Sequence, residues 1–250
     1  MVERQFAWED FDAMQFLPAC IASGAVSAAS GVFAWGAFAP GSQLFGRTIR
    51  RTDDSATMAL TFDDGPNPAV TPPLLDLLDR HAVNATFFLI GKHVQAVPEL
   101  AREISRRGHT VGNHTYSHPQ LTFCSSARTR EELDQCDDAI DTATGGRPRW
   151  MRPPFGFRSP MLDGIARKRG RAGVVMWSAS ARDWKPQPAD SVIERLRRAR
   201  GGDVVLLHDG DHRLLKGDRR HTLEALAHWL PRWKDAGIRF VTLDELSEQA

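Results

Sequence analysis

From Thr57 onward, short apolar runs rich in β-branched and aromatic residues alternate with longer amphipathic stretches. This alternation predicts βα units whose strands lie parallel in one sheet. No shift in composition divides the region, so a single domain is expected. The candidate strands are residues 57–62, 84–91, 108–113, 149–152, 172–179, 203–208 and 238–243. Strands of this number with helices between them predict a closed or nearly closed α/β barrel of the TIM type.

Helices are predicted between these strands from their end signals. Residues 71–81 carry prolines near their start, where the first turn of a helix tolerates them. Residues 98–108 end on a glycine suited to a helix C-terminus. Residues 125–146 combine a serine-rich start with a glycine stop, so the sequence marks both ends of this helix.

Charge and cysteine content exclude some functions. Lysine and arginine number 32 and aspartate and glutamate 31, for a formal charge of +1. This balance argues against an electrostatic nucleic-acid binder. The three cysteines, Cys20, Cys124 and Cys136, are widely spaced. They predict neither a disulfide framework nor a cysteine zinc site.

Residues 13–46 contain no charged side chain. The middle of this segment is long enough to cross a bilayer, which takes about 20 apolar residues. We therefore expect two parts: an N-terminal segment, residues 1–46, with a candidate transmembrane or anchor helix, and a barrel domain, residues 47–250. The alternative is a helix rich in alanine, glycine and serine that packs on the domain, because such residues are only weakly hydrophobic.

Polar side chains capable of catalysis follow the predicted strands. They are Asp63, Asp64, His114, Arg152, Asp183 and His208. In a parallel barrel the carboxyl ends of all strands lie on one face, where active sites are built. One pocket is therefore expected to contain all of these side chains.

Asp63 and Asp64 are adjacent, which is unusual for two acids that serve one site. Neighbouring side chains of a regular strand point to opposite faces, so the pair is expected where the strand gives way to a loop. Gly65 and Pro66 indicate such an ending. The alternative is a strand cap followed by a solvated turn.

His114 and His118 are four residues apart, a spacing that lets two imidazoles reach one ion. Pro119 argues against a long helix here, so a helical turn or tight loop is expected. Two histidines and one aspartate form a three-ligand set that leaves a position open for water or substrate, as in catalytic zinc sites. One acid of the pair can ligate the ion while the other accepts a proton from bound water. The alternative is two structural histidines.

Three further side chains fit roles around such an ion. Arg152 can hold the free carboxylate ionised and oriented. His208 can deliver a proton to a leaving group, and Asp183 can raise its pKa through a hydrogen bond. Trp184 can form a wall of the pocket. The alternatives are a surface arginine, a capping histidine, a turn aspartate and a core tryptophan.

Five motifs together carry a family resemblance: "TFDDGP", "HTYSH", "RPPFG", "RDW" and "LLHDG". In this order and with similar spacing, they resemble the polysaccharide deacetylase family, the NodB-homology or carbohydrate esterase family 4 enzymes, from about Thr57 to Leu246. The resemblance implies a distorted (β/α) barrel as the catalytic domain. It also implies a divalent metal, usually zinc, with Co²⁺, Ni²⁺ and Mn²⁺ left open.

The resemblance implies a hydrolase of carbon–nitrogen bonds that removes acetyl groups from N-acetylated, or O-acetylated, sugars. Metal-bound water would attack the acetamide carbonyl of a polysaccharide such as peptidoglycan or a chitin-like glycan. The implied metal ligands are Asp64, His114 and His118. Asp63 would be the catalytic base.

The resemblance also implies that Arg152 orients the base, that Asp183 tunes the acid His208, and that the Phe155 amide helps hold the oxyanion. This chain departs from the family at Phe155, where many members have tyrosine, a change that leaves the main-chain donor in place. It also departs at Ser180, where members often carry aspartate, and this puts part of the pocket wall in doubt.

Other functions stay open at this point. A deacylase of a small or lipid-linked amino sugar would suit the N-terminal segment, and a catalytically silent glycan-binding barrel is a further alternative. A metal-dependent phosphohydrolase would need further carboxylates that bridge two metal ions, and the sequence offers ligands for only one ion. The expected partners are an acetylated glycan or amino sugar and, through the N-terminal segment, a membrane, with no nucleic acid. The expected location is membrane-associated and facing the cell envelope, with the cytoplasm left open because Arg47, Arg50 and Arg51 follow the segment.

Overall fold

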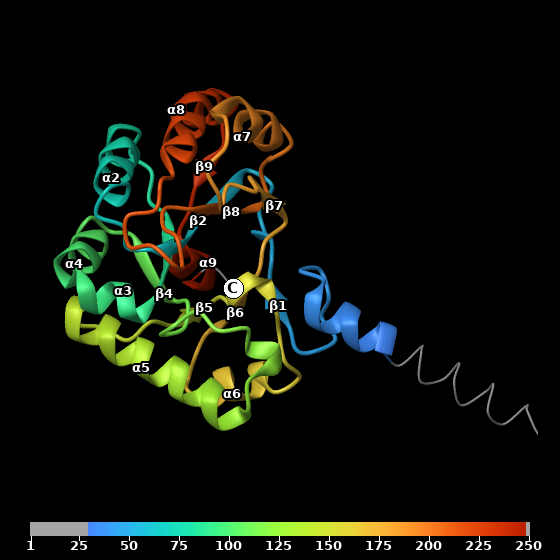
Figure 1. Cartoon of the computed structure of the whole chain (residues 1–250). Helices are drawn as coiled ribbons and strands as arrows, with labels where there is room; N and C mark the ends of the chain where they lie inside the picture. Colours follow the sequence, from blue (N-terminus) through green and yellow to red (C-terminus); the bar gives the residue numbers. More distant parts are fainter. Residues whose placement is uncertain (1–29, 249–250) are drawn as a thin grey trace, which may run out of the picture.

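A curled parallel sheet forms the centre of the protein in the computed structural model, which describes residues 30–248 (Figure 1). The strands are β1 (Thr48–Ile49), β2 (Thr57–Gly65), β3 (Thr86–Leu89), β4 (Thr110–Asn113), β5 (Trp150–Met151), β6 (Gly173–Val175), β7 (Ala179–Ser180), β8 (Val204–His208) and β9 (Arg239–Phe240). Their order is β1-β6-β5-β4-β3-β2-β8-β7, with β9 beside β2. All ladders between these strands are parallel. The predicted parallel sheet is confirmed.

The sheet does not close into a full barrel. Within residues 30–248 no ladder joins the end strands β1 and β7, and a single antiparallel bridge between Arg51 and Asp203 spans that side. The expected closed or nearly closed barrel is therefore corrected to a curled half-barrel. The physical reason is that β1, β5, β7 and β9 have only two residues each, too few to form the long ladders that closure requires.

Helices surround the outer face of the sheet (Figure 1). They are α2 (Thr71–Arg80), α3 (Gly91–Ala96), α4 (Pro98–Arg106), α5 (Ser126–Thr144), α6 (Leu162–Lys168), α7 (Ala189–Leu196) and α8 (Arg220–Asp235). The last helix, α9 (Leu243–Glu248), lies instead near the centre of the half-barrel (Figure 1). The end signals of α5 are confirmed: the Ser125 hydroxyl accepts a hydrogen bond from the Arg128 amide, and Gly145 follows at φ 78°. Prolines stand in the first turn of α2, as expected, and Pro98 also begins α4.

The strand alternation of β2 separates two apolar clusters. Met58, Leu60 and Phe62 face outward and pack in the large cluster beneath the helices. Ala59 faces inward, in a cluster that α9 closes through Leu243. Residues Thr61 and Asp63 follow Ala59 at intervals of two, so the inner face changes from apolar to polar toward the carboxyl end of β2.

The N-terminal segment is described only in part. Residues 30–38 form a helix beside β1, while residues 13–29 of the predicted anchor lie outside the described residues. Between residues 30 and 248, every helix is too short or too polar to cross a membrane. The end of this helix packs on the domain, as the alternative interpretation predicted. There Phe38 contacts Phe157 edge-on, with ring centroids 4.8 Å apart.

We predict that Phe87→Ala lowers the free energy of unfolding by about 3–5 kcal/mol, as for other buried aromatic truncations. Phe87 is fully buried and stacks on Phe62 with ring centroids 5.0 Å apart. Urea unfolding followed by circular dichroism measures the change. Phe123→Ala is the control, because this side chain is 76% exposed. Equal effects of the two substitutions would contradict the position of the core.

Candidate active site

Asp63 and Asp64 both reach the inner face of the sheet because β2 ends in a bulge. Opposite β3, Asp63 pairs with Phe88 and Gly65 pairs with Leu89, which leaves Asp64 as an extra residue. Asp64 has φ 70°, and a bulge of this kind re-aims a side chain. The acids were expected after the strand, and the structure corrects this: they lie within its last three residues.

Asp64, His114 and His118 come together at this end of the sheet. Asp64 Oδ1 lies 3.5 Å from His114 Nε2 and 3.2 Å from His118 Nε2. The three donor atoms lie within 4.8 Å of one another, and all three side chains are buried. The histidines lie in a tight loop after β4, in which Thr115 and His118 both have positive φ.

The loop that carries the histidines is fastened to α5 and to its own backbone. The Asn113 amide donates to Asp137 Oδ1 at 2.7 Å, and its oxygen accepts from the Thr115 amide at 2.8 Å. Ser117 donates to Glu132 through both its backbone amide and its hydroxyl. This support holds the imidazoles in place, as a ligand site requires.

The donor atoms fit a divalent cation. Asp64 Oδ1 is buried and makes no hydrogen bond, which is costly without a cation beside it. His114 Nδ1 lies 2.8 Å from the Arg152 carbonyl, so this nitrogen donates and Nε2 is free to ligate. Burial and the neighbouring His114 lower the pKa of His118 to about 2, so its imidazole is neutral. Although burial opposes it, the neighbouring histidines hold the pKa of Asp64 well below its usual range.

Asp63 is held by a fully buried arginine. Arg152 Nη1 donates to Asp63 Oδ1 and to the Thr61 hydroxyl, each at 2.8 Å. Its Nη2 donates to the Met176 carbonyl at 3.0 Å, and its guanidinium lies 4.4 Å from the Phe88 ring centroid. The reading of Arg152 as a surface residue is wrong, because its exposure is 0%.

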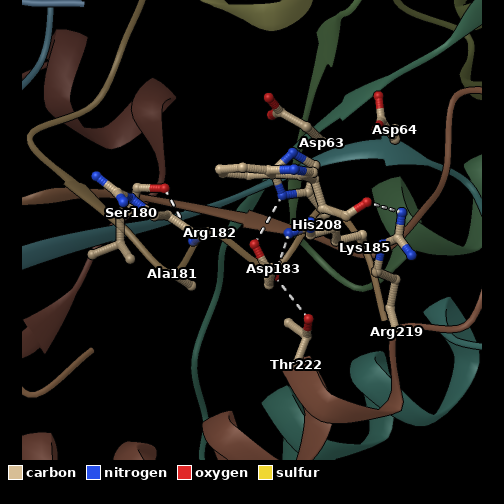
Figure 2. A network of polar contacts seen from close by, with 12 residues as sticks. Asp63, Asp64, Ser180, Ala181, Arg182, Asp183, Lys185, His208, Arg219 and Thr222 are labelled. Carbon is tan, nitrogen blue, oxygen red and sulfur yellow. Dashed lines mark hydrogen bonds and ion pairs between the residues drawn. The ribbon is translucent and has the colours of Figure 1, made fainter. Parts of the chain in front are cut away.

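His208, at the end of β8, is paired with Asp183 (Figure 2). The two carboxylate oxygens of Asp183 accept from His208 Nδ1 and from the His208 amide, each at 2.9 Å. Thr222 Oγ1 donates to the same carboxylate at 2.7 Å. Burial alone would lower the pKa of His208, but the Asp183 carboxylate raises it to about 9, with smaller contributions from Asp64 and Asp63. The imidazole is therefore protonated near neutral pH.

One cavity of about 400 Å³ is lined by Asp63, Asp64, His114, His118 and His208. Arg152 and Asp183 are fully buried and do not line it, so the expectation that one pocket contains all six polar side chains is corrected. The walls of the cavity also include Phe155, Phe157, Trp177 and Trp184. Phe155 has φ 59° and its ring stands edge-on to His118 at 4.6 Å. Trp184 is 48% exposed, so it is a wall residue and not core. Ser180 is not among the lining residues, and its hydroxyl accepts from the Arg182 amide.

His212 also lines the cavity and was not among the predicted site residues. Its ring stacks on His118 with centroids 4.5 Å apart and an interplanar angle of 22°. Its carbonyl accepts a hydrogen bond from Lys92 Nζ at 2.9 Å. The sequence held a signal for it, because His208 and His212 repeat the four-residue spacing of the first histidine pair.

Two buried residues missed at the sequence level support the Asp64 backbone. His93 Nδ1 lies 3.1 Å from the Asp64 carbonyl oxygen, with which it can share a hydrogen bond. Asp209 is fully buried, accepts a hydrogen bond from Thr71, and lies against Gly65 so closely that a Cβ there would clash with it. Burial raises the pKa of Asp209 to about 7, and the charge of Asp64 adds to the rise. The motif "LLHDG" includes Asp209, but its sequence assigns no role to this residue, because Asp209 and His93 both act through packing against the bulge.

Comparisons with known proteins agree with this geometry. The family profile described as polysaccharide deacetylase matches residues 50–174. A peptidoglycan-N-acetylglucosamine deacetylase of Bacillus cereus is 39% identical over 197 residues, covering 76% of this chain and 87% of the relative. A chitooligosaccharide deacetylase of a Bradyrhizobium species is 39% identical, covering 75% of this chain and 89% of the relative.

A solved structure shares the fold as well. The crystal structure of a peptidoglycan N-acetylglucosamine deacetylase superposes with a TM-score of 0.75 at 33% identity, covering 80% of this chain and 92% of that one. Sequence, fold and the arrangement of buried acids and histidines thus lead to the same assignment. This chain belongs to the polysaccharide deacetylase family of hydrolases.

Proposed function

We propose that this protein removes acetyl groups from N-acetylated amino sugars of a glycan, with peptidoglycan or a chito-oligosaccharide as substrate. The observation that carries the proposal is the single cavity in which a cation site, a base held by Arg152 and a protonated imidazole meet. The similarity to deacetylases of peptidoglycan and of chito-oligosaccharides supports the substrate class. We also propose that the enzyme faces the cell envelope, where such glycans lie.

Asp64, His114 and His118 are the proposed ligands of a divalent metal. Two imidazoles and one carboxylate suit zinc, which is our first choice, although affinity order alone does not select it over Co²⁺, Ni²⁺ or Mn²⁺. When bound, the ion polarises the acetyl carbonyl and lowers the pKa of water. Asp63, the other acid of the pair, keeps its hydrogen bond to Arg152 and is free to take a proton from the attacking water.

The remaining groups complete the reaction. The backbone amide of Phe155 is the proposed donor to the developing oxyanion. Phe155 and Gly156 both have positive φ, and both line the cavity. His208 donates a proton to the amine as the carbon–nitrogen bond breaks, and Asp183 keeps that imidazole charged and oriented. Phe155, Phe157, Trp177 and Trp184 supply apolar walls that exclude water and stack on sugar rings.

Release of acetate tests the function directly. The purified, metal-loaded protein is assayed against acetylated chito-oligosaccharides, peptidoglycan and acetylated xylan, with acetate and free amines both measured. We expect equal amounts of acetate and amine from the first two substrates. Acetate without amine, from xylan alone, would contradict N-deacetylation. Activity only on a small or lipid-linked amino sugar would assign the chain to that alternative.

The division of labour between the acids is tested by Asp63→Asn and His114→Ala. Asp63→Asn should retain the metal and lower kcat about 10²–10⁴-fold, the usual contribution of a general base. His114→Ala should lose the metal, as measured by inductively coupled plasma mass spectrometry after dialysis. A fully active Asp63→Asn protein would refute the role of base, and a metal-replete His114→Ala protein would refute the ligand set.

The pH dependence tests the acid. His208 must be protonated to act, so the raised pKa of about 9 places the alkaline limit of activity near that pH. Asp183→Asn keeps an acceptor for Nδ1 but removes the charge, so burial then dominates and lowers the pKa of His208. The alkaline limb of kcat/KM should move to lower pH. An alkaline limb at the same pH in Asp183→Asn would contradict the tuning role.

A further inference from the structure

A second cavity lies away from the active site and is rich in arginine. It has a volume of about 690 Å³ and lies between the segment after the N-terminal helix and the start of β6. Five arginines line it: Arg47, Arg50, Arg51, Arg167 and Arg171. The acids on its wall are Asp53 and Asp163. The cavity therefore carries an excess of positive charge.

Some of this charge has no partner. Arg51, Arg167 and Arg171 form ion pairs with Asp203, Asp163 and Asp137, respectively. In contrast, Arg47 and Arg50 pair with no acid among residues 30–248. Arg50 Nε and Arg171 Nε are buried without a hydrogen-bond acceptor, and Arg171 is only 7% exposed. Buried N–H groups of this kind are free to donate to an anionic acceptor.

Arg158 adds a third unpaired guanidinium beside this cavity. It is 1% exposed, and its Nε and Nη1 also lack acceptors. Its Nη2 donates to the Ala39 carbonyl at 3.0 Å, so it holds the end of the N-terminal helix. Burial and the nearby charge of Arg50 lower the pKa of Arg158. A bound anion would relieve both the desolvation and this repulsion.

Large apolar side chains gather on the adjoining segment. Val32, Phe33, Trp35, Phe38 and Leu44 are each at least 40% exposed. The helix that bears four of them extends from the domain beside β1 (Figure 1). Residues 13–29, which precede it, contain no charged side chain. Groups of exposed apolar side chains that include tryptophan and phenylalanine are typical of interaction sites.

We propose that residues 30–51 dock on a bilayer that contains anionic lipids. The exposed apolar side chains of the helix enter the interface, while Arg47, Arg50 and the arginine cavity bind lipid phosphates. Charge complementarity favours this partner, because apolar side chains flanked by unpaired arginines match the acyl and phosphate layers of an anionic membrane surface.

The docking face adjoins the active-site cavity. Phe38 of the helix contacts Phe157, and Phe157 lines that cavity and contacts Phe155. A docked molecule would thus open its site close to the membrane surface. This consequence rests on the proposed function, whereas the docking itself does not.

Co-sedimentation of the full chain with vesicles tests the charge contribution. Binding is expected to vesicles of phosphatidylcholine mixed with phosphatidylglycerol, to be weaker with phosphatidylcholine alone, and to fall with added salt. Arg47→Gln with Arg50→Gln should weaken it roughly tenfold to thirtyfold, since each arginine near a membrane contributes about fivefold. Arg102→Gln with Arg130→Gln, the same charge change on α4 and α5, is the control and should bind normally.

The apolar contribution is tested by the double substitution Val32→Ser with Trp35→Ser, which should abolish vesicle binding. Phe123→Ser is the control and should bind vesicles normally. Quenching of tryptophan fluorescence by brominated lipid should be seen in the native chain and fall in Trp35→Phe, which still binds. All these variants should keep native deacetylation of soluble chito-oligosaccharides, so a failure of docking is distinguishable from a failure of the proposed function.

Several results would overturn the proposal. The proposal fails if the native chain does not bind anionic vesicles, or if the control variants lose as much vesicle binding as the test variants. It also fails if vesicle binding survives both the arginine and the apolar substitutions. Tight binding of free glycerol phosphate without vesicle binding would assign the cavity to a soluble anion. Loss of binding to isolated peptidoglycan, with vesicle binding unchanged, would assign the face to the cell wall.

Discussion

The site depends on the bulge at the end of β2. A regular strand would point Asp63 and Asp64 to opposite faces, and only one acid could then serve the cavity. The extra residue at Asp64, with its positive φ, brings both acids to the inner face. Backbone in this conformation is costly for a residue other than glycine, so the surroundings must hold it. His93, on α3, and Asp209, after β8, lie against this turn and provide that support.

The two acids then differ because their neighbours differ. Arg152 neutralises Asp63 from inside the half-barrel, and its own burial is tolerated because Thr61, Met176 and Asp63 accept its hydrogen bonds. Asp64 faces two imidazoles and has an oxygen without a hydrogen bond. The two carboxylates thus have different surroundings, which match the proposed roles of Asp63 as base and Asp64 as metal ligand. The same contrast of environment sets His208 and His118 apart, since only His208 has a buried carboxylate bonded to its Nδ1.

The loops at this face are linked to one another around the cavity. Arg219 donates to the Trp184 carbonyl at 2.6 Å and to Asp211 at 2.9 Å, so the loop that carries His212 is tied to the loop that carries Asp183. On the other side, Phe155 and Phe157 join the cavity to the N-terminal helix. The N-terminal helix of the proposed membrane contact therefore packs against one wall of the proposed active-site cavity. The rings of Phe155 and Phe157 form this wall.

Local patterns in the sequence determined the parallel sheet, the ends of α5 and the identity of the proposed metal ligands, because strand alternation, capping residues and motif order are short-range properties. Tertiary structure decided the opening of the barrel and the bulge at Asp64. It also decided the contacts of His93, Asp209 and His212. These features depend on ladder length, on packing between segments far apart in the chain, and on which buried groups find partners. Local patterns give only the four-residue spacing of His212 from His208 and the place of Asp209 in the motif "LLHDG". They do not give the contacts, since that of His93 with Asp64 spans 29 residues and that of Thr71 with Asp209 spans 138.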